Sequence, residues 1–270
     1  PQKLEDALKA NPDARIVAFV HAETSTGAQS DVKTLVGLAH KHDCLTIVDS
    51  VTSLGGTPIK VDVWGVDAIY SGTQKCLSCV PGLSPVSFNE RAQEKIRDRK
   101  NKVQSWFMDL NLVMGYWGSG TTRSYHHTAP VNALYALHEA LLMLKEEGLE
   151  KAWNRHQKNH LALRAGLECL GMTFIVPEDE RLPQLNAVSI PEGVDDAQVR
   201  GRLLSEYNLE IGAGLGALAG KVWRIGLMGH ASRAENILLC VGALGAVLSD
   251  MGISVDTGNA LSAVQQSLKG

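Results

Sequence analysis

The chain has 270 residues, of which 44% are hydrophobic and 20% charged, and its formal net charge is −3 at pH 7. This composition is typical of a globular protein with a substantial core, arranged as one large or two modest domains. The near-neutral charge and the lack of a Lys/Arg cluster argue against nucleic acid or an anionic membrane as partner. The longest apolar run, 237–248, contains glycines and is too short to span a bilayer.

The first residues, PQKLEDALKANPDARIVAFV, carry no initiator methionine and start within a predicted surface helix. We therefore expect a chain whose amino-terminal part is missing. Five cysteines without regular spacing favour a reducing, intracellular compartment.

Helices and strands alternate along the first part of the chain. The predicted elements are a helix over 3–14, a strand over 15–21, a helix over 30–42, and strands over 44–50, 66–72 and 83–89. Ser30 is the expected N-cap of the second helix. Apolar strands that alternate with helices predict βαβ units, and therefore an α/β fold with a mainly parallel sheet.

The second part of the chain is richer in helix. Its predicted elements are long helices over 129–148 and 148–171, short strands over 172–176 and 186–190, a helix over 195–208, a strand over 222–228 and a helix over 232–252. This pattern predicts a smaller second domain. We place the boundary so that 1–148 belong to the large domain and 149–270 to the small one.

Polar clusters follow three of the predicted strands: HAETSTG, DSVTS and SGTQK. Because parallel strands carry ligands at their carboxyl ends, Thr24, Asp49 and Lys75 are expected on one rim of the sheet. Taken alone, Asp49 is more often a cap or turn residue, and Lys75 a solvated surface lysine. Their joint placement predicts a ligand site.

Residues 49–88, DSVTSLGGTPIKVDVWGVDAIYSGTQKCLSCVPGLSPVSF, closely resemble the cofactor-binding stretch of the fold-type-I pyridoxal-phosphate aminotransferases of the alanine–glyoxylate/serine–pyruvate branch. SYHHTAP (124–130) and GKVWRIGLMGH (220–230) also resemble that family, so the similarity covers essentially the whole chain. The resemblance implies pyridoxal 5'-phosphate as cofactor. It also implies a large domain with a mainly parallel sheet, here incomplete, a smaller α/β carboxy-terminal domain, and a homodimer with shared active sites.

The resemblance implies catalytic roles for Lys75 and Asp49. Pyridoxal phosphate acidifies an amino-acid Cα–H by delocalising the resulting charge into its ring. Asp49 would keep the ring nitrogen protonated, and Lys75 would bind the cofactor covalently and then carry the proton. Arg224 would clamp the substrate carboxylate with its planar fork. A structural ion pair is the alternative explanation for Arg224.

The resemblance also implies five further cofactor contacts. Thr24 would hydrogen-bond the ring hydroxyl, Val51 would pack on the ring, and Gln74 would reach the phosphate. Tyr125 and Thr128 would reach the phosphate of the neighbouring subunit's cofactor.

The expected reaction moves an amino group from alanine or serine to glyoxylate or another 2-oxo acid. A lyase or desulfurase of the same fold, or an inactive truncated fragment, are the alternatives. The family's glycine-rich phosphate-binding segment and its stacking aromatic residue have no counterpart in this chain, so the site is expected to be incomplete. The expected compartment is the peroxisome or the cytoplasm, with the mitochondrion as a further candidate.

Other motifs carry less weight. Cys76 and Cys79 have half of a zinc-binding pattern, and no second such pair follows, so packing is the expected role of both thiols. His126 and His127 should point in opposite directions on an extended segment and therefore share no ion. GAGLGALAG (212–220) matches a dinucleotide fingerprint, yet no helix is predicted after it, so we expect a glycine-rich turn.

Overall fold

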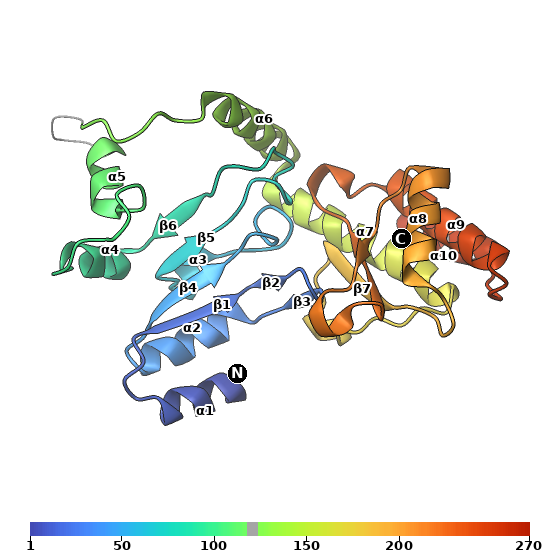
Figure 1. Ribbon diagram of the computed structural model, residues 1–270, viewed down its shortest axis with the longest axis horizontal. Coiled ribbons are helices and arrows are strands. Elements are labelled where there is room, and N and C mark those ends of the chain that lie inside the picture. Colours follow the sequence, from blue (N-terminus) through green and yellow to red (C-terminus); the bar gives the residue numbers. More distant parts are fainter. Residues whose placement is uncertain (118–123) are drawn as a thin grey trace.

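The computed structural model describes residues 1–117 and 124–270 of the chain. Within these residues the strands form sheets of four, two and three strands. Figure 1 shows the larger sheet in the amino-terminal half and the three-stranded sheet in the carboxy-terminal half, joined through α6 and α7. The two-stranded ribbon, β2 (Ala22–Glu23) and β3 (Ala28–Gln29), extends from the larger sheet towards the smaller one (Figure 1).

The larger sheet has the order β1-β4-β5-β6. Its strands are β1 (Ile16–Val20), β4 (Leu45–Asp49), β5 (Ala68–Tyr70) and β6 (Val86–Phe88). β1, β4 and β5 are parallel, whereas β6 runs antiparallel to β5. The predicted α/β pattern with a mainly parallel sheet is therefore confirmed, and each predicted strand of this half is present.

Five helices accompany the larger sheet: α1 (Gln2–Ala10), α2 (Val32–Lys41), α3 (Val61–Trp64), α4 (Glu90–Arg97) and α5 (Leu110–Trp117). α2 covers one face of the sheet, where its Val32 and Val36 pack against Val48 and Ile69. The predicted Ser30 cap is wrong. The cap is Asp31, whose side chain accepts from Thr34 N, while the Ser30 hydroxyl donates to the Val20 carbonyl.

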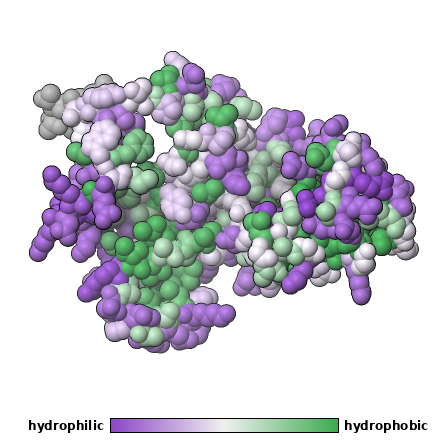
Figure 2. Space-filling model, viewed as in Figure 1, coloured by the Kyte–Doolittle hydropathy of each residue, from purple (hydrophilic) through white to green (hydrophobic). Residues whose placement is uncertain are grey.

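The opposite face of the larger sheet is apolar along the middle of its strands. Because side chains alternate along a strand, Leu45, Ile47 and Asp49 share this face. Leu45 and Ile47 line a cavity of about 240 Å³ together with Ile96 of α4. Figure 2 shows hydrophobic atoms gathered over β1 and β4. On this face of β4, the apolar side chains of Leu45 and Ile47 are thus followed by the carboxylate of Asp49 at the end of the strand.

The carboxy-terminal half is built on an antiparallel sheet of order β7-β9-β8. Its elements are α6 (Val131–Glu147), α7 (Leu149–Cys169), β7 (Leu185–Ser189), α8 (Asp196–Tyr207), β8 (Gly212–Ala213), β9 (Val222–Gly226), α9 (Ala234–Asp250) and α10 (Thr257–Lys269). The predicted strand 172–176 is wrong, since only a single bridge joins Phe174 to Val188. Helix α10 was not predicted from the sequence.

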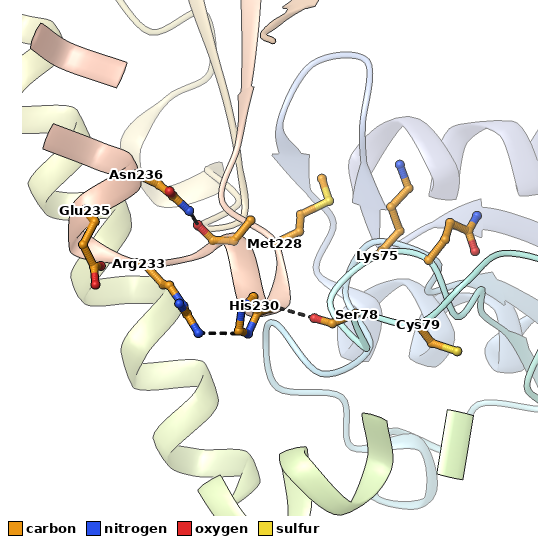
Figure 3. Close-up of a pocket in the computed structure, with 10 residues that line it drawn as sticks. Lys75, Ser78, Cys79, Met228, His230, Arg233, Glu235 and Asn236 are labelled. Carbon is orange, nitrogen blue, oxygen red and sulfur yellow. Dashed lines mark hydrogen bonds between the residues drawn. The ribbon is translucent and has the colours of Figure 1, made fainter. Parts of the chain in front are cut away.

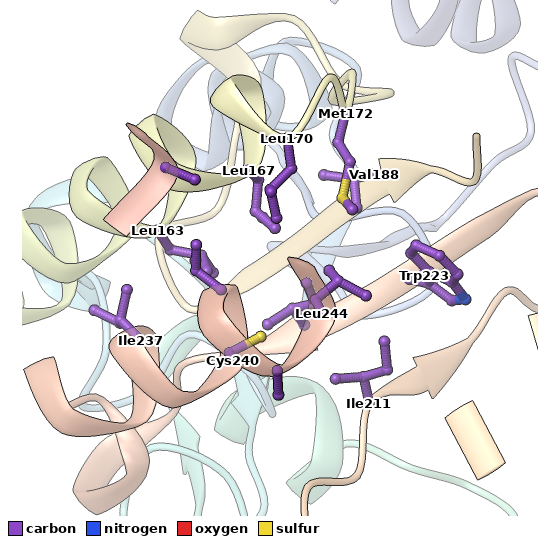
Figure 4. Packing of buried hydrophobic residues seen from close by; sticks show 14 of the residues in the cluster. Leu163, Leu167, Leu170, Met172, Val188, Ile211, Trp223, Ile237, Cys240 and Leu244 are labelled. Carbon is purple, nitrogen blue, oxygen red and sulfur yellow. The ribbon is translucent and has the colours of Figure 1, made fainter. Parts of the chain in front are cut away.

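The largest apolar core lies between this smaller sheet and its helices (Figure 4). Trp223 of β9 is fully buried there, and its indole N–H donates to Asp196 at 2.9 Å. Leu163 and Leu167 of α7 and Leu244 of α9 fill the same core. The core therefore fixes β9, the strand that carries Arg224. No helix in the described residues is both long and apolar enough to cross a membrane.

A buried carboxylate ties the strands of the larger sheet together. Asp67, only 1% exposed, accepts hydrogen bonds from the backbone N–H and hydroxyl of Thr46, from Asn89 Nδ2 and from Arg91, and it contacts His40 Nε2 at 2.9 Å. Burial alone would raise the pKa of Asp67, but the hydrogen bonds from His40, Asn89 and Thr46 outweigh it and lower the pKa.

We expect Asp67→Ala to reduce the free energy of unfolding by about 2–4 kcal/mol, because it leaves several buried donors without an acceptor. Denaturant titration of the variant and the wild type measures the difference. Asp13→Ala, at an exposed turn, is the matched control and should change stability by about 0.5 kcal/mol or less. If Asp67→Ala lowered the free energy of unfolding no more than the control does, Asp67 would not be the stabilising acceptor described above.

The contribution of Asp67 to the free energy of unfolding should depend on pH. A carboxylate whose pKa is lowered by folding stabilises the protein above its unfolded pKa, about 4, and loses that effect as pH falls through the folded pKa. The stability difference between wild type and Asp67→Ala should therefore shrink in acid below about pH 4. A difference that stays the same down to about pH 2 would be inconsistent with it.

Candidate functional site

Asp49 lies at the carboxyl end of β4, the central strand of the parallel group. Its register partners are Val20 on β1 and Tyr70 on β5. Both of its carboxylate oxygens are held: Oδ1 accepts from Val51 N at 2.8 Å, and Oδ2 accepts from the Tyr70 hydroxyl at 2.7 Å. The structure therefore presents a fixed, half-buried carboxylate at the predicted rim.

Lys75 lies in the turn that follows β5 and lines a cavity of about 750 Å³. Across this cavity from Lys75 are Met228 and His230, which follow β9 (Figure 3). Within the described part of the chain, Lys75 Nζ makes no hydrogen bond or ion pair, so its amine is available to a ligand. The size of the cavity is within the range of small-molecule sites.

The loops after β4 and β5 are joined through one carbonyl. Thr52 O accepts from the Cys76 thiol at 3.4 Å and from Gln184 Nε2 at 3.0 Å. Burial raises the pKa of the Cys76 thiol to about 12, which makes it unreactive. Cys76 thus acts as a buried hydrogen-bond donor. Its bond to Thr52 O holds the turn that carries Lys75 beside the loop that follows Asp49.

The Lys75 turn is also connected to the carboxy-terminal half. His230 N donates to Ser78 Oγ at 2.8 Å, a contact drawn in Figure 3. Gly229 N donates to His156 Nε2, and a Cβ at Gly229 would lie 2.0 Å from Ser78 Oγ. Burial lowers the pKa of His156, so its Nε2 stays an acceptor. Only glycine fits between the two halves at this point.

Arg224, on β9, reaches the rim from the smaller sheet. Its Nε donates to Ala213 O at 2.7 Å, and its Nη1 donates to Thr24 O at 2.9 Å. The second contact joins residues 200 positions apart in sequence. The expected alternative, an ion pair, is not what holds Arg224 in the described residues, because both of these partners are carbonyls. A guanidinium with five N–H donors keeps three for a ligand.

Gln74, Val51 and Thr24 occupy different positions around the rim. Gln74 is exposed and lines the same cavity as Lys75, with its amide folded over Gly72, where a Cβ would meet Gln74 Oε1 at 2.6 Å. Val51 comes two residues after Asp49, and Thr24 lies in the turn between β2 and β3. Of the eight residues predicted from the sequence, these three join Asp49, Lys75 and Arg224 at one end of the larger sheet.

Tyr125 and Thr128 lie apart from this group. The Tyr125 hydroxyl is 2.6 Å from Thr128 Oγ1, and Tyr125 is 68% exposed. Their segment runs between α5 and α6 and faces solvent (Figure 1). The two residues thus form a pair with each other, outside the rim of their own chain.

The two neighbouring histidines do not behave as predicted. His126 Nδ1 and His127 Nδ1 are 2.7 Å apart, so the expectation that the rings point in opposite directions is wrong. His126 also stacks on Trp106. Within residues 1–117 and 124–270, no group of three or more His, Cys, Asp and Glu side chains is arranged to hold a metal ion. The segment 212–220, expected to be a glycine-rich turn, forms the short strand β8 followed by a single 3-10 turn over Gly216–Leu218.

Tyr70, Gln184 and His156 contribute to the rim but were not predicted. Tyr70 could have been found from the strand pattern, because it ends β5 as Asp49 ends β4. Gln184 and His156 follow no motif, and only the folded structure brings them to the two loops.

Residues 1–237 match the family model described as aminotransferase class-V. The (S)-ureidoglycine–glyoxylate transaminase of Bacillus subtilis (strain 168) is 38% identical over 267 residues, which are 92% of this chain and 64% of the relative. The alanine–glyoxylate aminotransferase of Rattus norvegicus is 40% identical over 237 residues, 87% of this chain and 57% of the relative. The chain thus spans about three fifths of the length of these relatives.

Solved structures of aminotransferases also superpose closely on this chain. The crystal structure of an alanine–glyoxylate aminotransferase from Nostoc sp. superposes with a TM-score of 0.88 at 50% identity, over 92% of this chain and 65% of that one. The Bacillus subtilis ureidoglycine–glyoxylate aminotransferase gives 0.95 at 38%, over 100% of this chain and 69% of that one. A cysteine desulfurase from Thermococcus onnurineus gives 0.70 at only 16%, a likeness of fold alone.

The predicted fold class, that of the fold-type-I pyridoxal-phosphate transferases, is confirmed by these neighbours. The family match covers most of the chain, and the Bacillus subtilis aminotransferase superposes over all of it. The chain therefore belongs to the class-V aminotransferase family.

Proposed function

We propose that the protein is a pyridoxal-phosphate-dependent aminotransferase that moves an amino group from alanine or serine to glyoxylate or a related 2-oxo acid. The observation that carries the proposal is the convergence of three groups at one end of the larger sheet. These are the amine of Lys75 on a cavity, the fixed carboxylate of Asp49 and the guanidinium of Arg224. Relatives at 38–40% identity are named for transfer to glyoxylate, which supports this acceptor.

The residues present fit the cofactor. Lys75 and Gln74 line a cavity of about 750 Å³, whereas Asp49 and Arg224 are not among the residues that line it. Within the described residues, the Lys75 amine makes no hydrogen bond or ion pair that would compete with a cofactor. Asp49 is fixed in place by two hydrogen bonds, as a partner of a ring nitrogen must be. Gln74 lies on the same cavity with its amide available for a phosphate. Bound between Lys75 and Asp49, the cofactor would supply an electron sink that acidifies the substrate Cα–H.

The chain's own residues would divide the remaining work. Lys75 Nζ would first hold the cofactor covalently, and the same amine, once displaced, would take the proton from the substrate Cα and return one to the product. Asp49 would hold a proton on the ring nitrogen through its charge. Val51 would pack on the ring, and Thr24 would hydrogen-bond the ring hydroxyl.

Arg224 would orient the substrate through its carboxylate. Its Nε and Nη1 contacts with Ala213 O and Thr24 O fix the plane of the guanidinium, so the remaining N–H groups form a preorganised fork. A fork of this kind binds a carboxylate through two parallel hydrogen bonds. Alanine, serine and glyoxylate all carry that carboxylate, which explains how one residue could serve both donor and acceptor.

Tyr125 and Thr128 would act across a homodimer. Both residues are exposed and their hydroxyl groups lie side by side, which is consistent with a reach towards the phosphate held by a second copy. In that assembly each active site would take Lys75 from one subunit and the Tyr125–Thr128 pair from its partner.

Borohydride reduction in the presence of pyridoxal phosphate should fix the cofactor on Lys75 as a stable amine. Peptide mapping by mass spectrometry locates the label. Lys75→Ala should remove it, whereas Lys221→Ala, at the exposed residue directly before β9, should not. A label that persists in Lys75→Ala would rule out this lysine.

Asp49→Asn should preserve size and remove the charge that protonates the ring nitrogen. We expect the half-reaction with alanine to slow by about 100-fold or more while cofactor is still bound. Stopped-flow absorbance measures the rate. Near-normal turnover in Asp49→Asn would exclude the proposed role.

Arg224→Lys keeps a positive charge but loses the planar fork. The apparent affinity for alanine and glyoxylate should fall by about 1.5–3 kcal/mol, as expected for a charge-assisted contact, whereas cofactor loading should hardly change. Steady-state kinetics and an absorbance titration measure the two effects. Loss of cofactor with unaltered substrate affinity would reverse the assignment.

Shared sites can be tested by mixing two inactive variants. Co-expression of Lys75→Ala with the double variant Tyr125→Ala/Thr128→Ala should restore about a quarter of the wild-type activity, because half of the dimers are mixed and each has one intact site. Each variant expressed alone is the control. If the mixture stays as inactive as its parents, the two groups do not serve one site across a dimer.

A further inference from the structure

Tyr70 contacts the carboxylate on which the proposed chemistry depends. It is the last residue of β5 and the direct register partner of Asp49 on the parallel neighbour β4. Register partners in adjacent strands point to the same face of the sheet. The Tyr70 hydroxyl accordingly lies 2.7 Å from Asp49 Oδ2 and donates to it.

Asp49 is restrained from two sides. Val51 N holds Oδ1 at 2.8 Å through a tight turn of the backbone, and the Tyr70 hydroxyl holds Oδ2. With one oxygen bound, a carboxylate can still rotate about its Cα–Cβ and Cβ–Cγ bonds. With both bound, it is confined to one orientation. Each oxygen keeps a further lone pair for a ligand.

Tyr70 remains a donor under all conditions in which the protein would work. The hydrogen bond to Asp49, partial burial and the charge of Asp49 together raise the pKa of Tyr70 above its usual value of 10. Tyr70 is 39% exposed, so its ring lies at the surface of the rim and is not part of an apolar core. Replacement by phenylalanine would remove the donor and leave the strand pairing intact.

We propose that Tyr70 is a positioning residue that acts through Asp49, holding its carboxylate in the one orientation in which it partners the cofactor's ring nitrogen. This inference rests on the proposed function. It assigns Tyr70 no contact with substrate and no transfer of a proton. A carboxylate that is already ordered loses no conformational freedom when the cofactor binds. The hydrogen bond from Tyr70 therefore strengthens cofactor binding.

The test is a double-mutant cycle on the dissociation constant of pyridoxal phosphate, measured by absorbance titration of the apoprotein. Tyr70→Phe should raise this constant about tenfold, the size expected for a hydrogen bond to a charged group. In an Asp49→Ala background the same change should have an effect of less than about twofold, because no carboxylate is left to position. Tyr207→Phe, in the core of the other half, is the matched control and should leave the constant unchanged.

A second readout separates positioning from loss of structure. The rate of the half-reaction with alanine at saturating cofactor should also fall in Tyr70→Phe, while the thermal unfolding midpoint stays within the range of the Tyr207→Phe control. An unchanged dissociation constant and rate in Tyr70→Phe would overturn the inference. So would an equal loss in the Asp49→Ala background, which would show that Tyr70 acts independently of Asp49.

The proposed function can fail separately in the same experiment. If the wild-type protein takes up no cofactor on Lys75, both the function and the role of Tyr70 are overturned. If the wild type loads cofactor and Asp49→Ala weakens it, but Tyr70→Phe matches the wild type, only the role of Tyr70 is lost.

Discussion

The site depends on the parallel pairing of β4 with β1 and β5. This pairing places Val20, Asp49 and Tyr70 in one row at the carboxyl edge of the sheet. Every loop that follows a parallel strand leaves from this edge, so the turns that carry Thr24 and Lys75 start within one or two strand widths of Asp49. An antiparallel β4 or β5 would send one of these turns to the opposite edge, and the constellation could not form.

The pairing alone does not complete the site, because Arg224 belongs to another sheet. Polar contacts that bring the two halves together include Arg224 with Thr24, Gln184 with Thr52, His230 with Ser78, and the backbone pair Leu182 N and Gly27 O. Each involves a backbone carbonyl or a backbone N–H on at least one of its sides. Such contacts tolerate little displacement, since hydrogen bonds weaken steeply when their geometry is disturbed. Lys75 and Arg224 are therefore held in a fixed relation by groups that have no chemical role of their own.

Several reactive side-chain types near the rim are made inert by their surroundings. Burial raises the pKa of Cys76 and lowers those of His21 and His156, so these groups stay neutral. His156 and Cys76 are used as hydrogen-bond partners of the two loops. Lys75, in contrast, lines the cavity, and its amine makes no hydrogen bond or ion pair within the described residues. Cys76, His21 and His156 are therefore structural groups, whereas Lys75 lines the cavity together with the half-buried thiol of Cys79.

The sequence by itself determined the fold class and the identity of the groups at the strand ends. Alternating apolar strands and helices indicate a parallel sheet, and Thr24, Asp49 and Lys75 follow its strands directly. These are local patterns, with a period of two or 3.6 residues, and they can be recognised without knowing what packs against them. The cap of α2 was misplaced by one residue, because Ser30 and Asp31 are both good caps and only the fold directs Ser30 to Val20 O.

Only the tertiary structure decided how these groups are held. The contacts of Arg224 with Thr24 and of Gln184 with Thr52 join positions 200 and 132 residues apart, and no local pattern encodes a contact of that separation. The nearness of His126 to His127 depends on side-chain rotation and on stacking against Trp106, which the extended backbone alone does not fix. The sequence thus supplied the reactive groups, and long-range packing set their geometry, because the orientation of a side chain is determined by whatever surrounds it in space.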